Sequence, residues 1–203
     1  MTICVPVCRC LLKRHALIAA TTVLLAGFNT HAAASDNETA ATDVNPSPIH
    51  VDLAQDWPWW RGATHDGIAN PDQHLPVTWS DTENIVWKAN LPGRSHGSPI
   101  VVGDQVVVTA ADNDRNVQTV LCFDRKTGKP LWETVIHEKG LDVKNNEKSS
   151  MASAAAACDG DRFFVNFLNG DSVYMTAIDR EGKKLWQTKL SAYINHQGFG
   201  SSP

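Results

Sequence analysis

Residues 112–116 carry oxygen ligands in the order in which a calcium loop begins. They read Asp-Asn-Asp-Arg-Asn, and an Asp-x-Asp-x-Asn run opens the EF-hand loop. That loop requires Gly at its sixth position and a bidentate Glu at its twelfth, where this chain has Val117 and Phe123. We therefore expect no calcium site in this stretch and assign no metal ligand to it.

Histidine, the commonest zinc ligand, is dispersed along the chain. The five histidines after residue 56 form no i, i+4 pair and have no cysteine at zinc spacing. They are His65, His74, His96, His137 and His196, and each is expected to be solvated or to cap a backbone group. The sequence also lacks G-x-S-x-G, H-E-x-x-H and a phosphate-binding loop, so it names no catalytic residue.

The N-terminus is typical of a secretory signal peptide. A basic stretch at residues 9–14 precedes an uncharged apolar run at 16–28, and Ala32-Ala33-Ala34 offers an A-x-A cleavage site, with residues 30–32 as a second option. The run is short for a bilayer span, so cleavage of residues 1–34 is favoured over an uncleaved anchor. No cysteine follows residues 25–27, where a lipoprotein would have one. The product is expected to be exported, periplasmic or extracellular, without a membrane span.

Leader removal takes three basic residues and no acidic ones, which changes the net charge from −4 to −7. No basic run suits nucleic acid, so no such partner is expected. Only Cys122 and Cys158 remain after residue 34. An exported compartment permits a disulfide. Both cysteines lie in apolar strand-like runs of different repeats, so buried thiols are the favoured interpretation and pairing stays open.

Residues 35–55 are rich in Ala, Asn, Asp, Thr and Pro and predict a flexible linker. A lead-in at 56–89 opens with Trp57-Pro-Trp-Trp-Arg-Gly62, which favours a packing cap over an aromatic ligand platform. Apolar runs separated by Gly and Asp turns then predict strands, and no run has helical periodicity. The predicted strands are 85–88, 99–102, 105–110, 117–123, 130–136, 153–158, 163–167, 172–178 and 184–190.

One hairpin pattern occurs twice, at residues 121–132 and 177–186. An apolar run ends in Asp, a tight turn contains Gly, and a new apolar run carries Trp. These structural repeat residues are Asp124, Gly128 and Trp132 in the first copy and Asp179, Gly182 and Trp186 in the second. The Asp can bond the turn's N–H groups and the Gly permits positive φ. We expect the Trp ring to dock on a neighbouring unit while its N–H meets a carbonyl, which is a packing role.

Four strands per repeat predict an all-β fold built from antiparallel β-propeller blades. We place blade one at 95–136, blade two at 151–190 and the start of blade three at 198–203. The pattern apolar-Asp-x-x-(x)-Gly-Lys-x-Leu-Trp resembles the PQQ-like (quinoprotein-type) β-propeller repeat over residues 56–203. Propellers close with about four to eight blades, so the ring is incomplete and the sequence resembles an N-terminal fragment. Assembly of several short chains into one ring is the alternative.

The resemblance implies two functions. One is an exported, non-enzymatic scaffold that binds a protein or glycan partner, with no cofactor. The other is a PQQ-dependent dehydrogenase of alcohols or sugars, for which the resemblance implies a vicinal Cys-Cys pair, a catalytic Asp and calcium held by Glu, Asn and Asp. This sequence has no Cys-Cys pair, and the other ligands would come from blades that it does not contain. We therefore favour the scaffold; a hydrolase site on the loops is a third and weaker possibility.

Strand direction indicates where a ligand could bind. Antiparallel strands alternate, so alternate connections lie on opposite faces. The longer connections, 111–116, 137–150 and 191–199, are expected to crowd one face, and long loops on a rigid scaffold are the usual binding surface. That face is the candidate site as a region, without individual binding residues.

Overall fold

The computed structural model describes residues 2–6, 50–73, 75–143 and 145–203, which all belong to one compact unit. All the regular secondary structure in these residues is β-strand, as the sequence predicted. The strands are β1 (Thr2–Pro6), β2 (Ile85–Asn90), β3 (Ile100–Val102), β4 (Gln105–Asp112), β5 (Val117–Asp124), β6 (Pro130–His137), β7 (Ala157–Cys158), β8 (Arg162–Asn169), β9 (Ser172–Asp179) and β10 (Lys184–Ala192). No helix among the described residues is long and apolar enough to cross a membrane.

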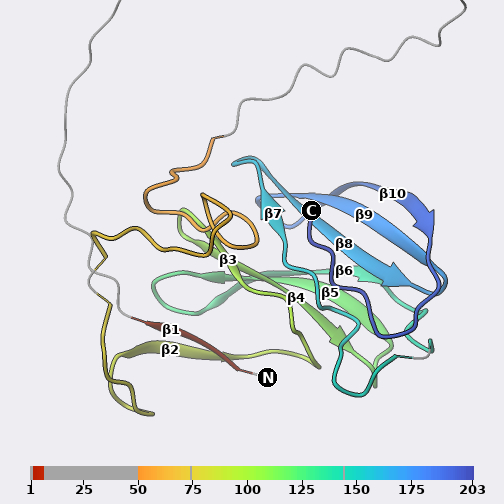
Figure 1. Cartoon of the computed structure of the whole chain (residues 1–203), viewed down its shortest axis with the longest axis horizontal. Helices are drawn as coiled ribbons and strands as arrows, with labels where there is room; N and C mark the ends of the chain where they lie inside the picture. The colour runs from red at the N-terminus through yellow and green to blue at the C-terminus, as the bar shows by residue number, and fades with distance from the viewer. Residues whose placement is uncertain (1, 7–49, 74, 144) are drawn as a thin grey trace, which may run out of the picture. The chain divides into compact units, whose positions relative to one another are not determined.

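Eight of these strands form two four-stranded antiparallel sheets (Figure 1). One has the order β3-β4-β5-β6 and the other β7-β8-β9-β10, so each strand pairs with the next along the chain. This is the arrangement of a propeller blade, and it confirms two blades. The following segment, up to residue 203, contacts the second blade: Ala155 N donates to Ser202 Oγ over 2.9 Å.

The first strand of blade two is shorter than predicted. Residues 153–156 were expected in a strand, but β7 covers two residues only. Their backbone groups serve neighbours instead of a ladder. The carbonyl of Ala154 accepts a hydrogen bond from Thr109 Oγ1 at 2.9 Å, and Ala155 N donates to Ser202 Oγ over 2.9 Å. Just before this segment, Ala152 O accepts the N–H groups of His96 and Gly97 at 3.0 and 3.2 Å. The segment therefore joins blade two to blade one, and it does not pair with β8.

Two apolar cores explain the order of these elements. One lies between the blades and contains Val120 and Cys122 of β5 together with Phe163, Val165 and Phe167 of β8. The other lies between β2 and blade one. Strands β4 and β5 are therefore covered on both faces, which explains why six consecutive residues of β4 and seven of β5 are buried.

Cys122 and Cys158 are both buried and unpaired, which confirms the buried thiols. Burial raises the pKa of Cys122 to about 12 and that of Cys158 to about 11, so both stay protonated and unreactive.

The lead-in packs on the blades as a cap. Trp57 forms an antiparallel bridge with Val101, and the backbone N–H of Trp57 donates to Val101 O over 2.7 Å. Trp59 stacks on His65 at a centroid distance of 5.1 Å, whereas Trp60 is exposed. Residues 50–55, assigned to the linker by sequence, also make contacts: His50 N donates to Asp159 O over 2.8 Å. The rest of the linker and most of the leader lie outside the described residues.

β1 belongs to the predicted leader, and the structure pairs it with β2. The two strands are antiparallel and form a separate two-stranded sheet, drawn at the lower left of Figure 1. Cleavage of the leader stays a prediction. Within the whole chain, residues 2–6 contribute backbone to the sheet.

Candidate binding site on the long-loop face

The repeated Trp joins one unit to the next. Trp132 Nε1 donates to Arg180 O of blade two over 2.9 Å, and Trp87 Nε1 of β2 donates to Arg125 O of blade one over 2.9 Å. Each ring lies against a turn glycine with positive φ, Gly182 for Trp132 and Gly128 for Trp87. A Cβ on either glycine would overlap the ring, so the turn must carry Gly at this position.

The repeated Asp residues hold the turns. Asp124 Oδ1 accepts the N–H groups of Lys126 and Thr127 at 3.1 and 2.7 Å and the Thr127 hydroxyl at 2.6 Å. The hydrogen bonds from Thr127 hold the pKa of Asp124 below its usual value. Asp179 Oδ1 similarly accepts two N–H groups of its own turn. Both carboxylates therefore hydrogen-bond within their own hairpin turns.

Sequence reasoning missed a repeated arginine. Arg125 and Arg180 directly follow the two repeat Asp residues, which was the available signal. Arg180 Nη1 donates to Gly160 O over 2.8 Å and its Nη2 to Val102 O over 3.0 Å, so it ties the first turn of blade two to that of blade one. Arg125 Nη1 donates to Gly103 O over 3.2 Å in the equivalent way. On the short-turn face, the repeated arginines thus bind carbonyl groups of neighbouring turns.

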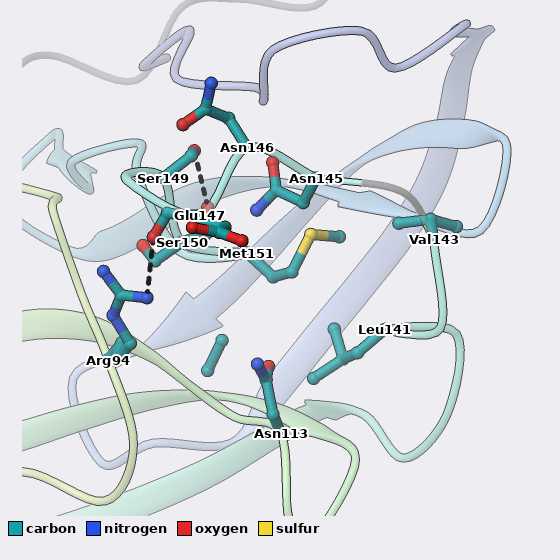
Figure 2. A pocket seen from close by; sticks show the side chains of 11 residues that line it. Arg94, Asn113, Leu141, Val143, Asn145, Asn146, Glu147, Ser149, Ser150 and Met151 are labelled. Carbon is teal, nitrogen blue, oxygen red and sulfur yellow. Dashed lines mark hydrogen bonds between the residues drawn. The ribbon is translucent and has the colours of Figure 1, made fainter.

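The long connections meet on the other side and enclose a pocket of about 210 Å³ (Figure 2). Two of the predicted loops contribute to it, and a third element, the connection from β2 to β3, was missed. The lining residues are Arg94, Ala111, Asn113, Leu141, Val143, Asn145, Asn146, Glu147, Ser149, Ser150 and Met151. Figure 2 shows Asn113 on the opposite side of the pocket from Asn145 and Met151.

Arg94 is the cationic residue of this pocket. Its backbone pairs with Ala111, with N···O distances of 2.8 and 2.9 Å, and this anchors it to the end of β4. Its Nη1 donates to Glu147 O over 3.1 Å. None of the ion pairs among the described residues involves Arg94. A guanidinium carries five N–H donors, so those that Glu147 O does not use can serve an acceptor on a ligand in the pocket.

Asn145 also lines the pocket. Its Oδ1 is buried and has no hydrogen-bond partner within the described part of the chain. A buried acceptor without a partner costs about 1–3 kcal/mol. Leu141, Met151 and Ala111 are buried beside it and supply an apolar floor.

The third long connection lies against the pocket wall. Asn146 Nδ2 donates to Gln197 Oε1 over 2.9 Å. Gly198 packs closely on Ser149, and Tyr193 packs edge-on against Phe199 with centroids 5.5 Å apart. Strand direction thus brings three long connections to one face, and the 91–99 connection joins them.

Residues 112–116 tie two of these loops together. Asp112 Oδ1 accepts the N–H of Asp114 at 3.0 Å, and Asn116 Oδ1 accepts the N–H of Leu141 at 3.0 Å. Asn116 Nδ2 also donates to Asp142 Oδ2 over 3.0 Å. These oxygens therefore fix loop geometry. Within the described ranges, no three His, Cys, Asp or Glu side chains gather as a metal site would require.

The prediction for His137 was wrong. Instead of being solvated or capping the backbone, it is half-buried between the blades, with Nδ1 2.8 Å from Gln118 Oε1 and Nε2 3.1 Å from Gln187 Nε2. An amide oxygen accepts and an amide nitrogen donates, so Nδ1 carries the proton of a neutral ring. Burial, and secondarily the charge of Lys184, lowers the pKa of His137 to about 4.

Four-stranded antiparallel blades, joined by a Trp that docks on an Asp–Gly turn, define a β-propeller of PQQ-like repeats. Residues 72–197 match the model of the family described as "Outer membrane protein assembly factor BamB", and the chain belongs to this family.

Two curated proteins show the range of this similarity. The chain is 33% identical over 111 residues to the outer membrane protein assembly factor BamB of Burkholderia pseudomallei (strain K96243), a match that covers 54% of this chain and 24% of that protein. It is 24% identical over 157 residues to the polyvinylalcohol dehydrogenase of Sphingopyxis sp. (strain 113P3), covering 77% of this chain and 22% of that protein. It thus spans about a quarter of each relative.

Proposed function

We propose that this chain is part of an exported, non-enzymatic propeller scaffold that binds a protein partner through the long-loop pocket. The pocket lined by the donors of Arg94, the amide of Asn113 and an apolar floor of Leu141 and Met151 carries this proposal. A glycan remains the other ligand class that such polar groups could take. One relative is named an assembly factor, which supports a protein partner over a glycan.

The pocket suits a short extended stretch of polypeptide. A peptide unit offers one C=O and one N–H. The C=O can accept from Arg94, and the N–H can donate to the exposed amide oxygen of Asn113. A side chain of the partner can then lie on Leu141 and Met151. The volume of about 210 Å³ is below the 300–1,000 Å³ typical of sites for drug-sized ligands. It therefore suits one side chain better than a large cofactor.

A selection from a phage-displayed heptapeptide library against the whole chain tests the proposal. Enriched peptides are expected to bind the chain saturably and to bind Arg94→Ala at least tenfold more weakly, because a charge-assisted hydrogen bond contributes about 1.5–3 kcal/mol. Arg115→Ala is the matched control: Arg115 is an exposed arginine of the 111–116 connection, and it is not among the residues that line the pocket. Failure to enrich any peptide, or equal loss in both variants, would contradict the proposal.

The second candidate is a quinoprotein dehydrogenase, which the match to polyvinylalcohol dehydrogenase favours. The described residues do not fit PQQ and its calcium. Cys122 and Cys158 lie buried in different blades, and no acidic trio gathers near the pocket. Adding PQQ and calcium to the purified chain tests this candidate. Saturable PQQ binding with dye-linked oxidation of an alcohol or sugar would replace the scaffold proposal.

A further inference from the structure

β2 docks on blade one in the way that β6, the outer strand of blade one, docks on blade two. Its Trp87 occupies the place that Trp132 has in β6: both indole N–H groups donate to the carbonyl after a repeat Asp, and both rings lie on a turn glycine. In blades one and two the outer strand pairs with a third strand of the same sheet. Within the described residues the ladder partner of β2 is β1.

The β1–β2 pairing reproduces the register of a complete blade. In all three ladders the repeat Trp pairs with one residue, the preceding apolar residue is skipped as a bulge, and the residue before that is paired again. The pairs are Val5↔Trp87 and Pro6↔Ile85 in β1–β2, Cys122↔Trp132 and Phe123↔Pro130 in β5–β6, and Ala177↔Trp186 and Ile178↔Lys184 in β9–β10. β1 therefore occupies the position of a third blade strand.

The skipped residue has a similar exposed fraction in each copy. Val86, Leu131 and Leu185 are 46%, 50% and 45% exposed. The same bulge thus points the same kind of side chain to solvent in all three ladders. A strand that paired with β2 in an arbitrary way would not be expected to share both the direction and the bulge position.

An open edge on β2 would be costly. A strand edge presents unpaired N–H and C=O groups and invites pairing with another chain. The leader, which the sequence predicts to be cleaved at residues 32–34, includes β1. Its removal would expose the β2 edge while Trp87 stays docked on blade one.

We propose that β1 is a stand-in for the third strand of a blade. It covers the β2 edge in the uncleaved chain, and removal of the leader frees that edge for the third strand of a further PQQ-like blade. The geometry selects this occupant, since the incoming strand must run antiparallel to β2, place one residue opposite Trp87 and leave Val86 bulged. In the uncleaved chain the leader thereby blocks premature pairing of this blade.

Hydrogen exchange of the β2 amides in the whole chain tests the proposal. Cys4→Pro with Val5→Pro removes an N–H from both alternating positions of β1, so β2 is expected to exchange at least tenfold faster. Cys4→Ala with Val5→Ala keeps both N–H groups and is expected to leave the exchange of β2 slow. Exchange of β4 reports the fold in both variants and should not change.

A synthetic peptide of residues 172–182, which carries a third strand and its turn, is then added to each variant. It is expected to restore slow exchange of β2 in the proline variant and to leave the alanine variant unaffected. Three results would overturn the proposal: equal exchange of β2 in both variants, fast exchange of β2 that the peptide does not slow, or a dimer of the proline variant with β2 protected. In the dimer, a second copy would be the occupant.

Discussion

The outer strands of the two blades have matching sequences and opposite surroundings. Position by position, Trp132, Thr134 and Ile136 of β6 correspond to Trp186, Thr188 and Leu190 of β10. Ile136 is 4% exposed and Trp132 packs on the core between the blades, whereas Leu190 is 50% and Trp186 is 40% exposed. Blade two covers β6, and no described residue covers the same face of β10.

This difference shows what a repeat residue contributes. The same Trp stabilises strongly or weakly according to the unit that it meets, because each repeat buries its faces on its neighbours. It also separates the two faces of the blades. The short-turn face is occupied by repeat residues that bond one another. The long-loop face carries residues that do not repeat, and there one buried acceptor lacks a partner.

Alanine substitution of the two tryptophans is expected to have the largest effect. Trp132→Ala removes the inter-blade ring and its hydrogen bond and should lower the free energy of unfolding by about 3 kcal/mol or more. Trp186→Ala should lower it by only about 1–2 kcal/mol, because the ring is 40% exposed and its aromatic contact is Phe164 of its own blade. Urea unfolding of both variants measures the difference. Equal losses would break the contrast between β6 and β10.

Glycine substitutions sharpen the same contrast at the turns. Gly182→Ala forces a Cβ to within 2.7 Å of the Trp132 ring at a φ of +89°, so it should cost about 2–4 kcal/mol. Gly170→Ala is the control: its φ is +59° and its Cβ would meet nothing, so only the backbone cost of about 1–2 kcal/mol applies. Thermal unfolding and urea titration compare the stabilities of the two variants. If the Gly182 variant is no less stable than the Gly170 variant, the Trp132 ring can pack on a turn that carries a Cβ.

The covered interface should also respond to pH. His137 faces Lys184, Tyr174 and the two glutamine side chains, while β10 has Ser191 at the equivalent position. Burial lowers the pKa of His137 from 6.5 to about 4. Between these values the unfolded chain binds more protons than the folded chain, so stability falls as the pH drops from about 6.5 towards 4.

Urea unfolding between pH 4 and 7 measures this loss in the free energy of unfolding. Because the ring is only half-buried, we expect a loss of about 1–2 kcal/mol in the natural chain. His137→Gln should remove that part of the pH dependence. If the variant follows the same pH curve, the titration belongs to other groups.

Local chemistry predicted the fold well. Alternating apolar runs and Asp–Gly turns specify each hairpin, so the strands, their pairing and the buried cysteines followed from sequence. The absence of a strand at residues 153–156 was not predicted, because their backbone bonds to the side chains of Thr109 and Ser202 instead of to a ladder. The repeated Arg125 and Arg180 were visible beside the Asp residues, and only the structure shows the carbonyl groups that they reach.

The site was predictable only as a region. Strand direction placed the long loops on one face, but Arg94 enters the pocket through pairing with Ala111, 17 positions along the chain, which no local pattern reveals. The missing partner of Asn145 is likewise a property of the assembled loops. The pairing of residues 2–6 with β2 was hidden because those residues carry the signal of a leader.

The footprint of a selected peptide tests most directly whether binding belongs to the long-loop face. Hydrogen exchange of the chain with and without the peptide gives this footprint. We predict slower exchange in residues 141–151 and around Arg94, with no change in the turns at 124–128 and 179–182. Protection of those turns, with the pocket unaffected, would contradict the assignment of the two faces.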